Sequence, residues 1–474
     1  MWFNSWEFLF FLPVVLIFYY VFSHRVQNIW LLIASYFFYG WWDWRFLILI
    51  FISTSVDYFS ALFIYNNTEE KKRKIGFYAS IVVNLGLLGV FKYFNFFIDN
   101  FIALGSAVGI NLNTPVMRLI PPVGISFYTF QTLSYTIDVY RNIQKPALNF
   151  FDFALYVSYF PQLVAGPIER ASSLLPQILK KRKVNSEMIN SGLLLILIGF
   201  FKKIAIADTA AAGVEEVFSN PARFSSWFLW KGLYLFSIQI YCDFSGYSNI
   251  ARGVSKLFGI ELMENFKSPY LSKNITEFWR RWHISLSTWL KDYLFIPLNL
   301  KLRYLKHFGT AISIIITFLL CGLWHGAAWT FIVWGLLHGL FLATHLYWNK
   351  SMMSGSVRRF FNFPSSIGKV VSVIVVFHLV SFSWIFFRSQ DFSEALIYMN
   401  GILSFKGEFS FRFFLMPATL LTLLIPLDFT QYKKPDLVGI PSWPRLLRSA
   451  YYIIMILSVI LLSSNEIPFI YFQF

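Results

Sequence analysis

Residues 310–348 read TAISIIITFLLCGLWHGAAWTFIVWGLLHGLFLATHLYW, and almost every position in this stretch is apolar. A short break around His325, with a glycine on each side, divides it into two apolar runs. Each run approaches the roughly 20 residues that a helix needs to cross the hydrocarbon core of a membrane. Unpaired backbone groups are not tolerated in lipid, so helices are the expected spanning element. The stretch therefore predicts two membrane helices joined at His325.

The composition extends this pattern to the whole chain. Hydrophobic residues make up 57% of the 474 residues, charged residues 14% and aromatic residues 21%. Soluble proteins average roughly 45–50% apolar and 25% charged residues. A soluble fold of this size could not hide so much apolar surface, so we expect an all-α polytopic membrane protein with about 11 transmembrane helices. The spans are expected near 7–22, 28–41, 46–65, 76–98, 118–138, 190–207, 226–247, 310–324, 327–348, 367–387, 412–429 and 449–470, with shorter re-entrant or interfacial segments at 151–165 and 284–298.

The basic residues predict the orientation of the chain. The net charge is +16, from 40 Lys and Arg against 24 Asp and Glu. The positive residues gather in short loops between apolar runs, which favours membrane topology over nucleic-acid binding. Placing these loops on the cytoplasmic side puts both chain ends outside. The basic clusters lie at 71–74, 180–183, 252–306 and 433–448, and the connections 105–117, 208–225 and 389–411 are then expected outside. The first apolar run lacks the basic region and cleavage site of a signal peptide, so we expect a retained helix.

Residues 248–307 are too polar to span the membrane and too long for a hairpin. Loops of this length in compact structures are usually functional or disordered. The segment is dense in Trp, Tyr and Phe, which argues against disorder. We expect short helices that lie in the cytoplasmic interface or dip into the helical bundle.

His325 is the first candidate for chemistry, because it is an ionisable residue within a long apolar stretch. Gly322 and Gly326 suit a broken helix, and irregular backbone at membrane depth is tolerated only inside protein or along a cavity. An intramembrane ionisable group is a functional candidate by default. The competing interpretation is a core histidine that bonds a backbone carbonyl, and the pattern alone leaves both open.

The second candidate is the segment 276–293, TEFWRRWHISLSTWLKDY. If it is one helix, Glu277 and Arg281 can pair at i,i+4, and Arg280 shares a face with His283 at i,i+3. The simple interpretation is an amphipathic surface helix with basic anchors, with an interfacial belt formed by Trp279, Trp282 and Trp289. The functional interpretation is a pocket in which arginines receive phosphates and His283 assists proton transfer.

No metal site is expected. The seven histidines are His24, His283, His307, His325, His338, His345 and His378, and none stands at i,i+4 to another with a carboxylate, as a zinc helix requires. Cys242 and Cys321 have no metal-ligand spacing and do not form a disulfide framework. No GxSxG elbow or phosphate-binding loop occurs.

Two polar islands interrupt apolar surroundings. In residues 241–248, Asp243 is placed by the pattern at a helix end, where it could pair with a nearby arginine. Residues 160–170, rich in Pro and Gly, are interpreted as a re-entrant turn. Neither island identifies a reaction by itself.

Taken together, these residues resemble the membrane-bound O-acyltransferase (MBOAT) family, most closely its bacterial branch that O-acetylates alginate and related polysaccharides. The resemblance covers nearly the whole chain, and the matching stretches occur in family order. They are PPVGISFY (121–128), IDVYR (137–141), LVAGPI (163–168), DFSGYS (243–248), MENF (263–266), 278–293 and GLWHG (322–326). His325 matches the essential histidine of the family, and His283 matches the second histidine of this branch.

The resemblance implies one MBOAT-like membrane domain over 1–474, shaped as a bowl of helices with a central tunnel. Within it, 1–105 would be N-terminal helices, 118–348 the motif-bearing catalytic core and 367–474 C-terminal helices. The acyl donor would enter from the cytoplasm and the acceptor from outside. The cell inner (plasma) membrane is the expected location.

The resemblance also implies roles for single residues. His325 would be the base that takes the acceptor proton, and His283 would polarise the thioester carbonyl or orient the acceptor. Donor binding falls to Arg280, Arg281, Trp279 and Trp282, because guanidinium groups suit the phosphates of acetyl-CoA or a similar thioester. The supporting core residues are Asp243, Ser245, Trp324, Asp292 and Asn265.

The implied function is transfer of an acyl group, expected to be acetyl, from a cytoplasmic thioester to a hydroxyl of an extracytoplasmic polysaccharide such as alginate. Transfer could be direct or could pass through an extracytoplasmic acetyltransferase partner. Peptidoglycan, another cell-wall polymer or a partner serine remain open as acceptors. The rival interpretation is a transporter or channel without chemistry of its own. It explains the hydropathy and the intramembrane His325, but not the ordered motifs.

Overall fold

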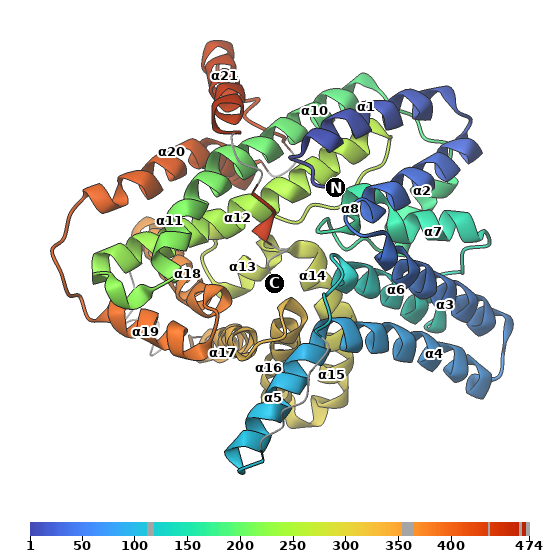
Figure 1. Cartoon of the computed structure of the whole chain (residues 1–474), viewed down its shortest axis with the longest axis horizontal. Coiled ribbons are helices and arrows are strands. Elements are labelled where there is room, and N and C mark those ends of the chain that lie inside the picture. Colours follow the sequence, from blue (N-terminus) through green and yellow to red (C-terminus); the bar gives the residue numbers. More distant parts are fainter. Residues whose placement is uncertain (111–117, 353–364, 435–436, 464–466, 471–474) are drawn as a thin grey trace. The chain divides into compact units, whose positions relative to one another are not determined.

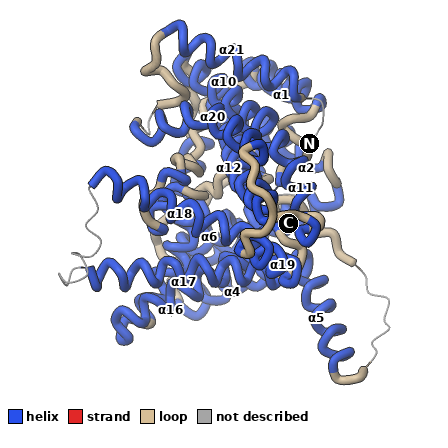
Figure 2. The backbone as a smooth tube through the Cα atoms, turned by 90° about the vertical axis from the view of Figure 1, so that its left-hand side faces the viewer, coloured by secondary structure: helices blue, strands red, loops and turns tan. Residues whose placement is uncertain are grey.

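The computed structural model describes residues 1–110, 118–352, 365–434, 437–463 and 467–470. The backbone over these ranges is helical with connecting loops, and it contains no β-strand (Figures 1 and 2). This result confirms the all-α fold. The chain forms two compact units, which we call the N-terminal unit (residues 1–193 and 251–263) and the C-terminal unit (residues 194–250 and 264–474).

The N-terminal unit contains the first nine helices, the start of the tenth and two short helical turns. The helices are α1 (Trp6–Val21), α2 (His24–Gly40), α3 (Leu47–Asn66), α4 (Glu70–Leu88), α5 (Phe94–Ala107), α6 (Ile125–Tyr140), α7 (Phe150–Ser158), α8 (Phe160–Leu163), α9 (Ala171–Leu179) and the start of α10 (Ser186–Phe200), with η1 (Trp44–Phe46) and η2 (Gly89–Tyr93) as the turns.

The C-terminal unit contains the remaining elements. They are η3 (Phe201–Asp208), α11 (Thr209–Phe218), η4 (Pro221–Arg223), α12 (Ser226–Leu257), η5 (Pro269–Leu271), α13 (Ile275–Arg281), α14 (Ile284–Leu290), η6 (Lys291–Phe295), α15 (Ile296–Lys301), η7 (Arg303–Leu305), α16 (Lys306–His325), α17 (Trp329–Met352), α18 (Ser365–Arg388), α19 (Phe392–Leu403), α20 (Arg412–Lys433) and α21 (Arg445–Leu462). The last turns of α12 belong to the N-terminal unit.

Eight helices in the described residues are long and apolar enough to cross a membrane, so the chain is a multi-pass membrane protein. They are Trp44–Asn66, Glu70–Ala107, Ser186–Phe218, Arg303–His325, Trp329–Trp348, Ser366–Arg388, Arg412–Lys433 and Arg445–Leu462.

The predicted count of about 11 is not confirmed. Predicted spans at the positions of α1, α2 and α6 correspond to helices of only 16, 17 and 16 residues, and 16 residues rise about 24 Å, less than a typical core of about 30 Å. The predicted span 226–247 lies in α12, which is not among the eight helices. The last predicted span, 449–470, is also too long, because α21 ends at Leu462. Residues 464–466 of that span, and residues 111–117 of the predicted outer connection 105–117, lie outside the described residues.

A buried carboxylate organises the centre of the N-terminal unit. Asp57 of α3 accepts hydrogen bonds from Asn84 of α4 at 2.8 Å and from Thr136 of α6 at 3.0 Å, and it also accepts one from Ser80. Buried polar groups stabilise a fold only when they are hydrogen-bonded. The polar residues that interrupt these three apolar helices are therefore cross-links between the helices.

In the C-terminal unit, α16 and α17 form a tightly packed antiparallel hairpin (Figures 1 and 2). A Cβ atom placed on Gly322 would lie 2.2 Å from the carbonyl oxygen of Phe331, and one on Gly335 would lie 2.2 Å from that of Phe318. Small residues let membrane helices approach until their backbones touch. The glycines before and after His325 therefore bring the two helices together and hold the end of α16 in place.

This packing predicts the effect of a single methyl group. Gly322→Ala should lower the free energy of unfolding by at least about 1–3 kcal/mol, because the added carbon overlaps a backbone carbonyl that cannot rotate away. Gly86→Ala is the matched control, since nothing lies within 4 Å of its Cβ position on α4, and it should leave stability unchanged or raise it by about 1 kcal/mol. Thermal unfolding of the purified protein measures both. Equal stability of the two variants would contradict the packing argument.

Candidate active site

His325 is the last residue of α16, and the helix breaks there as the sequence predicts. Gly326 is extended, with φ −163° and ψ 154°, and α17 begins at Trp329. The His325 side chain is buried, with 6% of its surface exposed. Its ring centroid lies 5.0 Å from that of Trp324, 4.9 Å from Trp334 and 5.2 Å from Phe387. The imidazole thus lies in a pocket walled by aromatic rings.

His283 lies at the junction of α13 and α14, and its backbone is left-handed, with φ 42°. This conformation ends α13 at Arg281 and starts a new helix at Ile284. The prediction that Arg280 and His283 share a face of one continuous helix is therefore wrong. A left-handed residue other than glycine is uncommon and must be held by its surroundings.

Asn265 holds this junction in place. Its carbonyl oxygen accepts a hydrogen bond from the amide of Ile284 at 2.9 Å, and its side-chain oxygen accepts one from the amide of Ser285 at 3.1 Å. Its side-chain amide donates to Ser248 of α12 at 3.3 Å. Asn265 thus supplies acceptors for two amides in the first turn of α14, which an N-cap side chain would otherwise serve.

The structure brings both histidine rings into contact with Trp324. The ring of His283 lies 6.0 Å from that of Trp324, and the ring of His325 lies 5.0 Å from it. His283 also meets Phe244 of α12 at 4.6 Å, edge to face. The motifs around 244, 283 and 325 are far apart in the chain, and together they form one aromatic site.

Burial sets the protonation state of His283. The side chain is completely buried, and desolvation lowers its pKa from 6.5 to about 3. The charged form of a buried imidazole is disfavoured because it loses its hydration. His283 is therefore neutral at physiological pH.

His338 is a third buried histidine, which the sequence analysis did not select. The indole N–H of Trp279 donates to its Nδ1 at 3.2 Å, so Nδ1 is the acceptor and Nε2 carries the proton. Nε2 lies 2.9 Å from the hydroxyl of Ser383, which in turn donates to the carbonyl of Val380 at 2.6 Å. The available signal was the stripe Trp334, His338, Phe341 and His345, whose spacing places these residues on one face of α17.

The predicted tryptophan belt is wrong. Trp279, Trp282 and Trp289 are 6%, 3% and 4% exposed, so they are core residues and not interfacial anchors. Trp282 packs against Phe278 at 5.5 Å and Trp384 at 5.1 Å. The segment 276–293 enters the C-terminal unit instead of lying on its surface, which agrees with the alternative that these helices dip into the bundle.

The two predicted donor arginines differ in their surroundings. Arg281 pairs with Glu277 at 3.0 Å, as the i,i+4 spacing predicts, donates to the carbonyl of Lys267 and lies over the ring of Tyr432 at 4.7 Å. Arg280 is exposed and makes no ion pair in the described part of the chain. The structure therefore leaves Arg280 available for a ligand and commits Arg281 to the fold.

Arg280 opens onto a cavity of about 430 Å³, within the usual range for small-molecule sites. The cavity combines two cations with a largely apolar wall. It is lined by Thr276, Trp279, Arg280, Ile284, Ser287, Thr288, Leu290, Lys291, Phe295, Ile314, Thr317, Phe318 and Leu342. Thr317 is eight residues before His325 on α16, a rise of about 12 Å. The cavity therefore lies beside the helix that ends at His325.

Asp243 has a different position and a different partner from those that the sequence predicts. It lies in the middle of α12, not at a helix end, and pairs with Lys203 of η3 at 2.7 Å instead of with an arginine. Its other oxygen accepts a hydrogen bond from the amide of Ile470 at 2.8 Å. Of the other supporting residues, Ser245 is buried on the same helix, Trp324 is buried in contact with both histidines, and Asp292 lies in the π-helical turn η6.

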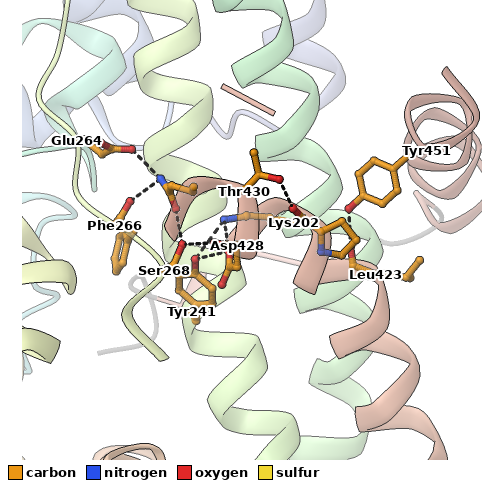
Figure 3. A network of polar contacts seen from close by, with 11 residues as sticks. Lys202, Tyr241, Glu264, Phe266, Ser268, Leu423, Asp428, Thr430 and Tyr451 are labelled. Carbon is orange, nitrogen blue, oxygen red and sulfur yellow. Dashed lines mark hydrogen bonds and ion pairs between the residues drawn. The ribbon is translucent and has the colours of Figure 1, made fainter. Parts of the chain in front are cut away.

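A second polar network joins α12, α20 and the loop before α13 (Figure 3). The hydroxyl of Tyr241 donates to Asp428 at 2.8 Å, and Lys202 lies 3.8 Å from the same carboxylate. Ser268 donates to the backbone carbonyl of Asp428 at 2.7 Å, and Gln431 donates to Glu264 at 2.8 Å. The network fixes the loop that carries Asn265.

The fold and the site define a multi-pass membrane protein with a buried histidine pair and an adjacent cavity that carries cationic groups. The model of the MBOAT, membrane-bound O-acyltransferase family matches residues 34–389. The chain belongs to this family, and it is an O-acyltransferase.

Named relatives cover most or all of the chain. The probable alginate O-acetylase AlgI of Pseudomonas putida is 36% identical over the full length of both chains. The peptidoglycan O-acetyltransferase of Helicobacter pylori is 36% identical over 85% of this chain and 80% of its own. The teichoic acid D-alanyltransferase of Bacillus subtilis is 30% identical over 59% of this chain and 71% of its own.

The lowered pKa of His283 predicts an acid-sensitive fold. In the unfolded chain His283 binds a proton near pH 6.5, whereas in the folded chain it stays neutral down to about pH 3. The contribution of His283 to the free energy of unfolding should therefore fall as the pH drops below about 6.5, by about 2 kcal/mol at pH 5. His283→Asn removes the titrating ring and tolerates the left-handed backbone, so it should lose less stability between pH 7 and pH 5.

Unfolding of the wild type and the variant at both pH values measures this difference. His307→Asn, at an exposed position near the start of α16, is the control and should follow the wild type. If His283→Asn also follows the wild type, His283 titrates normally and is not held neutral.

Proposed function

We propose that this protein transfers an acetyl group from a cytoplasmic thioester such as acetyl-CoA to a hydroxyl of an extracytoplasmic polysaccharide such as alginate. Transfer is either direct or passes through an extracytoplasmic acetyltransferase partner. The names of the relatives support acetyl transfer to a cell-surface polymer. The observation that carries the proposal is the buried His325 at the break between α16 and α17, with Trp324 in contact with both His325 and His283.

In this proposal His325 is the general base. Its imidazole takes the proton from the acceptor hydroxyl as the oxygen attacks the thioester carbonyl, which forms the C–O bond and a tetrahedral oxyanion. Collapse of that intermediate breaks the C–S bond, and the proton passes to the leaving thiolate. A positioned base contributes typically about 10²–10⁴-fold to such a reaction. The aromatic walls around His325 hold the ring in one place and keep bulk water from it.

His283 is proposed to donate a hydrogen bond to the carbonyl or to orient the acceptor. A neutral imidazole retains one N–H, and a fixed N–H donor stabilises charge that develops on a carbonyl oxygen. The low pKa of His283 suits a donor that stays neutral and argues against a role as the base.

The donor is proposed to bind at the cavity beside α13, with its phosphates near Arg280 and Lys291. Guanidinium forks match phosphate geometry, and a lysine adds a point charge. The basic loops support a cytoplasmic position for the side of the protein that carries this cavity. Both chain ends are then proposed to lie outside, with the protein in the inner membrane. The 20 residues of α16 rise about 30 Å from Lys306 to His325. The base then lies toward the outer face, where the acceptor arrives.

His325 is the critical test. His325→Ala and His325→Gln should insert, fold and bind the donor, while acetyl transfer falls by about 10²-fold or more. Glutamine keeps one hydrogen bond but takes no proton at neutral pH. Transfer from labelled acetyl-CoA by the purified protein measures the loss, and His307→Gln on the same helix is the matched control.

If His325 were a core histidine, its variants would lose stability by about 1–3 kcal/mol and keep their activity per folded molecule. A well-folded His325→Gln protein with a transfer rate near that of the wild type would remove His325 from the mechanism.

The two arginines should separate donor binding from folding. Arg280→Ala should raise KM for acetyl-CoA by about tenfold or more, the usual cost of losing a charged hydrogen bond, with little change in thermal stability. Arg281→Ala should do the reverse, because it breaks the Glu277 pair and leaves the donor site intact. Steady-state kinetics together with melting curves measure both effects. An unchanged KM in Arg280→Ala would place the phosphates elsewhere.

A further inference from the structure

A second cavity of about 830 Å³ lies in the C-terminal unit, between α17 and α18 and beside the residues that lead into α13. It shares no lining residue with the cavity at Arg280 and includes neither His283 nor His325. It is lined by Lys273, Asn274, Ile275, Phe341, Thr344, His345, Trp348, Gly368, Lys369, Val371, Ser372, Val375, Val376 and Leu379. The proposed acyl transfer makes no use of it.

One end of this cavity, at the start of α18, carries Lys369, and Lys273 also lines the cavity. Lys273 and Lys369 are both exposed, and neither ammonium group belongs to an ion pair within the described ranges. Glu277, four residues after Lys273, is already held by Arg281 at 3.0 Å and by the backbone amide of Lys273 at 2.9 Å. His345 adds an imidazole to the lining, and its Nδ1 lies 2.9 Å from the hydroxyl of Thr276. The Lys273 ammonium also lies over the ring of Tyr432, 5.9 Å from its centroid, a contact that leaves its charge unneutralised. Two lysines without a carboxylate partner in the described residues favour an anionic ligand.

The other end of the cavity is apolar and open. Ser372, Val375 and Leu379 lie on one face of α18, at the spacing of successive helical turns. Val375 is 50% exposed and Leu379 is 37% exposed, as expected for apolar side chains that a candidate membrane span presents to lipid. From Lys369 to Leu379 the helix rises about 15 Å. The groove therefore runs from a charged end into the apolar part of the spanning helix.

We propose that this groove binds an anionic phospholipid, with the headgroup between Lys273 and Lys369 and an acyl chain along α18. A free anion would use the lysines but not the exposed apolar wall, whereas a phospholipid uses both. The C-terminal end of α17 and the N-terminal end of α18 lie on the same side of the C-terminal unit (Figure 2). The basic loops predict that this side faces the cytoplasm. The cytoplasmic leaflet carries anionic lipids that basic pockets between helices recognise. Trp348, 45% exposed at the charged end, suits the headgroup level.

Native mass spectrometry of the purified full-length protein tests this assignment with phosphatidylglycerol and with phosphatidylcholine of the same acyl chains. The wild type should bind phosphatidylglycerol more tightly. The double variant Lys273→Gln, Lys369→Gln should raise the Kd for phosphatidylglycerol by about 30-fold, the loss expected for two lysines at a membrane surface. The matched control is Lys180→Gln, Lys181→Gln, which removes two exposed lysines from another basic loop.

A second variant tests the apolar part of the groove. Ser372→Phe places a bulky ring in the groove between Lys369 and Leu379, and it should weaken phosphatidylglycerol binding without removing a charge. Equal binding of both lipids by the wild type would overturn the proposal, and so would a double variant that behaves like its control. Displacement of phosphatidylglycerol by inorganic phosphate, together with unchanged binding by Ser372→Phe, would also overturn it, because the site would then bind free anions.

Discussion

The close approach of α16 and α17 is the constraint on which the candidate site depends. Gly322 and Gly335 leave no room for a side chain between the helix backbones, so the hairpin has one register. Membrane helices lack a hydrophobic drive toward one another, and close backbone contact supplies much of their association. The register sets where α16 ends, and His325 is the residue at that end. The position of the proposed base therefore follows from two glycines that never touch a substrate.

Buried charges fix the position of α12 relative to the elements that pack against it. Lys203 pairs with Asp208 at 2.8 Å and with Asp243 at 2.7 Å, and its side chain is fully buried. A buried ion pair adds little net stability, but loss of one partner is costly because the other charge is left unpaired. We interpret the cluster as a device that selects one arrangement of η3 and α12. The same helix carries Phe244 to the ring of His283.

The structure also explains why the chain contains so many aromatic residues. The rings of Trp279, Trp334, Trp384 and Phe387 surround His325 and His338. Large, rigid side chains exclude water and lose little entropy when they are ordered. The Trp279–His338–Ser383 chain satisfies the polar atoms that such a core would otherwise leave unpaired. A neutral histidine can therefore be held deep in the protein beside the proposed base.

The sequence alone determined the helical membrane fold, the break at His325, the Glu277–Arg281 pair and the family, because apolar run length, glycine position and i,i+4 spacing are local properties. It did not determine that His283 is left-handed, that Trp279 and Trp282 are buried, or that Asp243 pairs with a lysine. Those features depend on which distant segment packs against each side chain. Arg280 and Arg281 show the difference best: they are adjacent and chemically identical, and only the neighbours that the tertiary structure supplies leave one available for a ligand and tie the other to the fold.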